Sequence, residues 1–155
     1  MSQSVPQRLA ELSLVLPAAA KSVANYLPVA ASGNLVLTSG QLPLADGKLV
    51  ATGLLGRDLD VAQGMLAARQ CALNILAQVE AHLGSLDKIG AIAKITVFVA
   101  SAPGFTEQHL VANGASDLLV AVLGDKGKHA RSAVGVAALP LNAPVEIEAI
   151  IQTAS

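Results

Sequence analysis

Two stretches of the chain repeat apolar residues at helical spacing. Residues 61–83 carry apolar side chains every three or four positions, and Asp60 with Gln63 three residues later forms a capping box at their start. A second apolar stripe follows Thr106, which we expect to cap the helix, and ends before Gly124. The pattern therefore predicts two amphipathic helices, each with one face against a core.

Extended runs surround these helices. They are residues 25–40, read as two strands around the turn at 32–34, then 41–51 with a turn at Asp46-Gly47, and 92–99, 131–139 and 145–151. In the last run apolar residues alternate with others, so Glu146 and Glu148 face away from the core.

The order of these elements indicates one domain of the α+β class. Residues 1–24 read as a lead-in, with a short helix from Ser4 to about Leu12 and an extended segment after it. Residues 25–155 then form a single domain, in which we expect both long helices to pack on one face of a mixed β-sheet.

Composition adds one expectation, which concerns the sheet face that the helices leave uncovered. Hydrophobic residues make up 53% of the 155 residues and charged residues only 14%, against about 25% charged in a typical domain. With so few charges to solvate that face, we expect another copy of the chain to cover it. The formal net charge of −1 argues against nucleic acid and membrane surfaces as partners on electrostatic grounds.

The chain also lacks the signals of export and of common cofactor sites. It has no signal-peptide pattern, no apolar run of 18 residues, and a single cysteine, Cys71, expected to pack in the core, so we expect a cytoplasmic protein. The sequence contains no phosphate-binding or dinucleotide-binding glycine motif. His82 and His109 have no partner at metal-ligand spacing, whereas His129 lies two residues before Arg131 and should point to the same side.

Two charged residues stand in otherwise apolar strands. Arg131 and Glu146 would each cost several kcal/mol, by a rough estimate, if buried without a partner or ligand. One interpretation is a structural Arg–carboxylate bridge. The other is an arginine fork for a substrate carboxylate beside a glutamate that orders or activates water. The spacing alone leaves both interpretations open.

Four blocks of sequence carry a family resemblance. They are Thr38-Ser39-Gly40-Gln41, residues 94–99 (KITVFV), Ala130-Arg131-Ser132 and residues 145–150 (VEIEAI). In this order and spacing they resemble the YjgF/RidA family, often labelled endoribonuclease L-PSP, from about residue 25 to the C-terminus. The lead-in and the longer stretch between Phe105 and Arg131 are typical of a divergent branch.

The resemblance implies a chorismate-mutase-like fold, assembled as a homotrimer with three ligand sites between subunits. The implied reaction is hydrolysis of reactive 2-imino or enamine acids to 2-keto acids and ammonia, without cofactor or metal. By resemblance, Arg131 grips the substrate carboxylate and Glu146 positions the hydrolytic water. The other matching positions, expected to bind substrate, are Tyr26, Ser39, Gly40 and Asn113. Ala133 stands where the family often has a cysteine, which leaves the preferred imino acid open.

Two other functions fit the same residues. A non-catalytic protein could use the Arg131 cleft to bind 2-keto acids or similar small carboxylates. Endoribonuclease activity ranks lower, because the chain has no basic patch, only two Phe and one Tyr for base stacking, and no evident histidine pair.

Overall fold

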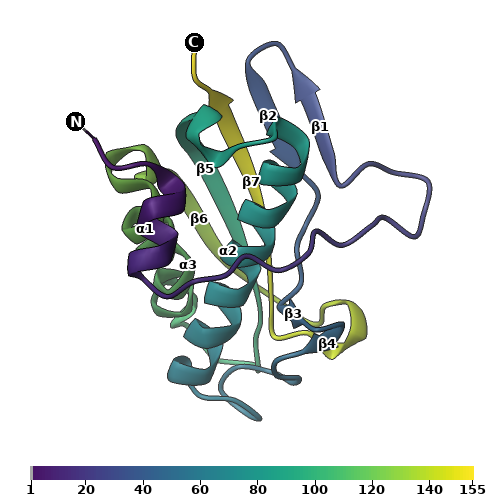
Figure 1. The fold of residues 1–155 in the computed structure, drawn as a ribbon. Coiled ribbons are helices and arrows are strands. Elements are labelled where there is room, and N and C mark those ends of the chain that lie inside the picture. The colour runs from purple at the N-terminus through teal and green to yellow at the C-terminus, as the bar shows by residue number, and fades with distance from the viewer. Residues whose placement is uncertain (1) are drawn as a thin grey trace.

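The computed structural model describes residues 2–155, and a five-stranded mixed sheet forms its centre (Figure 1). The strands are β1 (Val29–Ser32), β2 (Leu35–Thr38), β5 (Ile89–Ala100), β6 (Ala130–Val136) and β7 (Val145–Thr153), in the order β1-β2-β7-β5-β6. β6 runs parallel to β5, and the other neighbours are antiparallel. The predicted α+β class with a mixed sheet is confirmed.

Two long helices cover one face of this sheet, as predicted. They are α2 (Val61–Leu83) and α3 (Gln108–Leu123), and the short helix α1 (Val5–Glu11) lies beside α3 (Figure 1). Gly114 lets α2 and α3 approach closely, because a Cβ there would meet the carbonyl oxygen of Met65 at 2.1 Å. Within residues 2–155, three 3₁₀ turns complete the helical elements, η1 (Leu86–Lys88), η2 (Gly124–Gly127) and η3 (Pro140–Asn142).

The predicted starts of α1 and α2 agree with the structure, and the predicted start of α3 does not. The capping box predicted at Asp60 begins α2, and α1 begins after Ser4 as predicted, where Ser4 and Gln7 form a second capping box. The prediction that Thr106 caps α3 is wrong, since the helix begins at Gln108 and its N-cap residue, Glu107, makes no side-chain cap. The Gln108 side chain donates to the carbonyl of Phe105, three residues before it, at 2.8 Å.

A small second sheet lies apart from the main one. It is the predicted hairpin at Asp46-Gly47, with only two residues in each strand, β3 (Leu44–Ala45) and β4 (Lys48–Leu49). Asn74 of α2 fixes the chain before it, since its Nδ2 donates to the carbonyls of Leu42 and Leu44 at 2.9 and 3.0 Å. The hairpin is therefore tied to the helix layer.

The core lies between the helices and one sheet face. It includes the buried residues Ile95, Val97 and Val99 of β5, Val145, Ile147 and Ile151 of β7, and Cys71, Ile75 and Val79 of α2. The core position predicted for Cys71 is thus confirmed. On the opposite sheet face Leu35, Leu37 and Val134 remain 38%, 37% and 42% exposed, so this face presents apolar surface to its surroundings.

The segment before β1 crosses the helix layer. After α1 the chain passes over α2 and then swings into a wide loop that leads to β1 (Figure 1). Gln78 of α2, only 4% exposed, donates to the carbonyl of Ala20 at 2.7 Å and holds the crossing segment. In the described part of the chain, residues 2–155, none of the helices is both long and apolar enough to cross a membrane.

Candidate functional site

Arg131 lies on β6 and points toward the helix layer. Its cross-strand neighbour on β5 is the fully buried Ile95, and paired residues project to the same face of a sheet. Nη1 donates to Oδ1 of Asn113 at 2.8 Å and to Oγ of Ser116 at 3.1 Å, both on α3. Nη2 donates to the carbonyl of His109 at 3.2 Å. Helix α3 therefore fixes the plane of the guanidinium.

This arrangement leaves part of the guanidinium available. An arginine carries five N–H donors, and these contacts use both hydrogens of Nη1 and one of Nη2. Within residues 2–155 Nε and the second Nη2 hydrogen have no acceptor, and the side chain is half-buried. A planar group held in this way can offer two parallel donors to a carboxylate.

His129 extends the hydrogen bonds behind Arg131. Its Nδ1 lies 2.6 Å from the carbonyl oxygen of Gly127, and its Nε2 lies 2.9 Å from Oγ of Ser116. Because a carbonyl oxygen only accepts, we assign the hydrogen of the neutral ring to Nδ1, so Nε2 accepts from the Ser116 hydroxyl. The expectation that His129 and Arg131 point to one side is confirmed, since both contact Ser116.

Glu146 lies on β7 beside a gap in the β2–β7 pairing. After Leu37 the regular pairing stops, and it resumes where Gln41 and Ile147 exchange backbone hydrogen bonds of 2.8 and 3.1 Å. Gly40 is thereby pressed against the carboxyl group, and a Cβ at this position would lie 2.3 Å from Oε1 of Glu146. Only a residue without a side chain leaves room for the carboxylate here.

Its surroundings disfavour the charged form of this carboxyl. Burial raises the pKa of Glu146 above its ordinary value, and the negative charge of Glu148, two residues along the same strand face, raises it further. In the part of the chain that the structure describes, no cation opposes this shift. A half-buried carboxylate with a raised pKa is a suitable general base for proton transfer near neutral pH.

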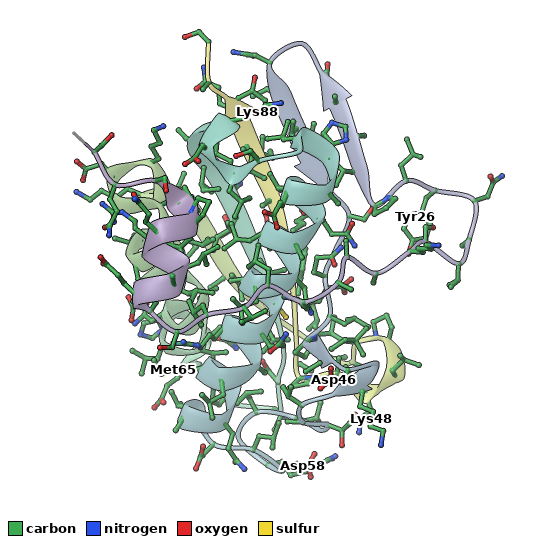
Figure 2. The ribbon with its side chains drawn as sticks, viewed as in Figure 1. Tyr26, Asp46, Lys48, Asp58, Met65 and Lys88 are labelled. Carbon is green, nitrogen blue, oxygen red and sulfur yellow. The ribbon has the colours of Figure 1, made fainter. Side chains whose placement is uncertain are left out.

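Three other predicted site residues line a cavity of about 580 Å³. Tyr26, Ser39 and Gly40 border it, together with residues 17–23 of the crossing segment. The Ser39 hydroxyl donates to the carbonyl of Leu27 at 2.6 Å, so it holds the loop that carries Tyr26. Tyr26 is 56% exposed and lies in the wide loop above the hairpin that carries Asp46 and Lys48 (Figure 2). The wall of the cavity thus contains Tyr26 and polar residues such as Asn74 and Gln78.

Arg131 and Glu146 lie on opposite faces of one sheet. Glu146 pairs with Phe98 on β5, three positions from Ile95, the partner of Arg131, and successive strand residues alternate between faces. The structure therefore brings Asn113 to Arg131, and brings Gly40 to Glu146, as two separate groups. A structural bridge between Arg131 and Glu146 within one chain, the first of the two interpretations, is wrong.

Sequence reasoning missed Ser116 as part of the Arg131 group. The signal was available, because Ser116 follows Asn113 by three residues and so shares its helix face. The apolar seam of α3 gave no reason to connect that face with Arg131, 15 residues beyond Ser116.

Among residues 2–155 no group of three or more His, Cys, Asp or Glu side chains is arranged to hold a metal ion.

Comparison with known proteins identifies the family. Residues 6–150 match the model of the YjgF/chorismate-mutase-like family, whose description also suggests endoribonuclease activity. The chain belongs to this family. The resemblance of the four sequence blocks is thus confirmed, and the YjgF model also covers most of the lead-in.

Three relatives illustrate this membership. Protein TCP17 of Trypanosoma cruzi is 48% identical over 152 residues, 97% of this chain and 95% of its own. The crystal structure of Atu1372 from Agrobacterium tumefaciens, described as of unknown function, is 56% identical, with a TM-score of 0.91 over 97% of this chain and 92% of that one. The E. coli TdcF structure with bound serine is 28% identical, with a TM-score of 0.62 over 88% and 94% of the two chains.

Proposed function

We propose that this YjgF-family protein hydrolyses reactive 2-imino or enamine acids to 2-keto acids and ammonia, at sites formed between the subunits of a homotrimer. The observation that carries the proposal is Arg131, which α3 holds in place with two guanidinium hydrogens left for a ligand. Two parallel N–H donors on a fixed plane match a carboxylate. The serine bound to E. coli TdcF has an α-carboxylate and an α-nitrogen, the two groups that define a 2-imino acid.

The assembly follows from where the two charged residues point. Arg131 and Glu146 face opposite sides of the sheet, so one site that uses both must take them from two subunits. The apolar sheet face with Leu35, Leu37 and Val134 supports burial against other copies of the chain. A closed cyclic assembly of three subunits would then contain three equivalent sites.

The reaction needs few groups. Arg131 of one subunit holds the substrate carboxylate, and the substrate then lies against the cavity wall that Tyr26 and Gly40 form in the neighbouring subunit. A water molecule attacks the imine carbon while Glu146 takes its proton, which gives a carbinolamine. Proton transfer to nitrogen and loss of ammonia leave the 2-keto acid. General-base help of about 10²–10⁴-fold suffices for this electrophilic substrate.

The test generates 2-iminopropanoate in situ with an amino-acid oxidase and lets the protein compete with semicarbazide for it. Wild-type protein should reduce the initial capture of the imine, because it converts the imine to pyruvate first. Arg131→Ala and Glu146→Gln should each lose at least about 100-fold of this activity, whereas His82→Gln, on the exposed end of α2, should retain it. Light scattering on the same samples gives the oligomeric state.

Two results would contradict the proposal. A folded wild-type protein that leaves imine capture unchanged is not an imine deaminase, and pyruvate binding by that protein would then support a small-carboxylate binding protein. A monomer with full activity would exclude sites shared between subunits.

A further inference from the structure

A hydroxyl group with a fixed direction connects Arg131 to a histidine. Ser116 accepts from Nη1 of Arg131 at 3.1 Å, and its hydroxyl lies 2.9 Å from Nε2 of His129. A free serine hydroxyl rotates, and in some rotamers its hydrogen would point at the guanidinium and oppose the Arg131 contact. An acceptor on the far side of Ser116 removes this freedom.

His129 is suited to be that acceptor. The carbonyl of Gly127, 2.6 Å from Nδ1, fixes the ring and its tautomer, so Nε2 presents a lone pair to Ser116. Gly127 is buried at the end of η2, where its backbone packs against Leu119 of α3, and a Cβ there would lie 2.2 Å from the Leu119 carbonyl oxygen. The histidine is thus positioned by rigid backbone rather than by a mobile side chain.

Three charged residues near His129 in the chain or the sheet have other neighbours. On its own loop, Asp125 and Lys128 pair with each other at 2.9 Å. Lys94 of β5, opposite Ala130, lies on the other sheet face near Glu148. Through the hydrogen bonds of residues 2–155, His129 connects to one charged group, Arg131, by way of the Ser116 hydroxyl.

We propose that His129 is a positioning residue for substrate binding, which acts through Ser116 to hold the Arg131 guanidinium in the plane that receives the substrate carboxylate. This inference rests on the proposed function of Arg131 and adds two residues to it. His129 itself touches neither the substrate nor the reacting atoms. Its loss should weaken binding, with the chemical step unchanged, because the guanidinium would keep only Asn113 as a fixed side-chain acceptor.

The experiment compares KM and kcat for 2-iminopropanoate in four variants. His129→Leu removes the acceptor and Ser116→Ala removes the hydroxyl, and each should raise KM about five- to tenfold with kcat within about twofold, the effect of one ordinary hydrogen bond. His129→Gln places an amide oxygen near the position of Nε2 and should restore most of the affinity. His82→Leu makes the same substitution at an exposed histidine and should change nothing.

A double variant tests whether the two residues act as one unit. His129→Leu with Ser116→Ala should raise KM no more than Ser116→Ala alone, because the histidine has nothing left to orient. Thermal unfolding of each variant shows that it is folded under the assay conditions. The calorimetric affinity for pyruvate gives the same comparison without turnover.

The outcomes separate the inference from the proposed function. If wild type is active but His129→Gln is no better than His129→Leu, or kcat falls instead of KM rising, the positioning role is wrong and the deaminase stands. If wild type neither hydrolyses the imine nor binds pyruvate, Arg131 holds no carboxylate and the inference fails with it. If wild type binds pyruvate without turnover, the pyruvate affinities of the variants decide. Weaker binding by His129→Leu that His129→Gln restores supports the role of His129, and equal binding by all variants overturns it.

Discussion

The carboxyl group of Glu146 occupies the place where a side chain of residue 40 would begin. A Cβ on Gly40 would lie 2.3 Å from Oε1 and 2.8 Å from Cδ of Glu146. The φ angle of Gly40 lies outside the left-handed region, so the glycine is needed here for space and not for an unusual backbone conformation. The position of the carboxylate therefore depends on a residue two positions beyond the end of β2.

Gly40→Ala should thus reduce activity far more than stability. The clash is with the end of a flexible, half-buried side chain, which can swing away at little cost to the fold but loses its position for catalysis. We expect the imine hydrolysis rate to fall at least about tenfold, with a Tm change below about 3 °C.

Gly104→Ala is the matched control. It has a φ of 86° and no heavy atom within 4 Å of its Cβ position, so it costs about 1 kcal/mol in backbone strain while activity remains. Equal activity of Gly40→Ala and wild type would show that the observed carboxylate position is unimportant.

Subunits with different defects should complement one another. If each site takes Arg131 from one subunit and Glu146 from the next, any mixed cyclic trimer of Arg131→Ala and Glu146→Gln subunits contains one intact site. Purification through both tags retains only mixed trimers, in which about a third of the sites are intact, so we expect about one third of wild-type activity.

The measurement is the activity of co-expressed, differently tagged variants purified through both tags in sequence. Each variant alone is the control for residual activity. No recovery in the mixed trimers would show that the two residues act within one subunit or that only one of them acts.

Glu146 should control the acid limb of the pH–rate profile. A general base must be ionised, so the rate falls as the pH drops through its pKa, and the raised pKa places this fall above that of an ordinary glutamate. Glu148→Gln removes the neighbouring negative charge, so the pKa of Glu146 should drop and the limb should move to lower pH. Burial remains, so the pKa stays above the ordinary value.

The profile of kcat/KM from pH 4 to 8, a range chosen about the ordinary glutamate value, measures this shift. Glu107→Gln, an exposed glutamate before α3, is the control and should leave the limb in place. A limb that moves equally in both variants would indicate a general effect of net charge instead of the Glu146 environment.

Local sequence signals predicted most of the fold. The helix start at Ser4, the capping box at Asp60 and the alternation in 145–151 depend on residues within a few positions of one another, and the structure confirms them. The prediction that Thr106 caps α3 was wrong because a threonine caps a helix only where the first helical turn begins, and α3 begins one residue later than a Thr106 cap requires.

The site was harder to predict because its parts meet through strand pairing. Alternation placed Glu146 away from the core, but the face of Arg131 depends on how β6 pairs with β5, which no spacing within β6 reveals. The separation into an Arg131 group and a Glu146 group followed from that register. The contact of Gly40 with Glu146 likewise depends on where β2 pairing stops, more than 100 residues away along the chain.

The crossing segment should be released when its anchor is removed. Gln78 is 4% exposed and donates to the carbonyl of Ala20, next to Lys21, which lines the 580 Å³ cavity. In Gln78→Leu this carbonyl loses its donor and the leucine cannot replace it, so local opening becomes easier by an estimated 1 kcal/mol or more. Trypsin should then cut after Lys21 at least about fivefold faster than in wild type, because cleavage follows the open population.

Gln70→Leu is the control for a lost glutamine on the same helix. Gln70 donates to the carbonyl of Leu44 at 3.1 Å, on the side of the hairpin, so cleavage after Lys21 should stay at the wild-type rate. Mass spectrometry of early digestion products identifies the cut.

Because residues 17–23 form one wall of the cavity with Tyr26, Gln78→Leu should also raise KM for imines with long side chains more than for 2-iminopropanoate. Equal KM changes for both substrates would show that this wall does not contact the substrate side chain.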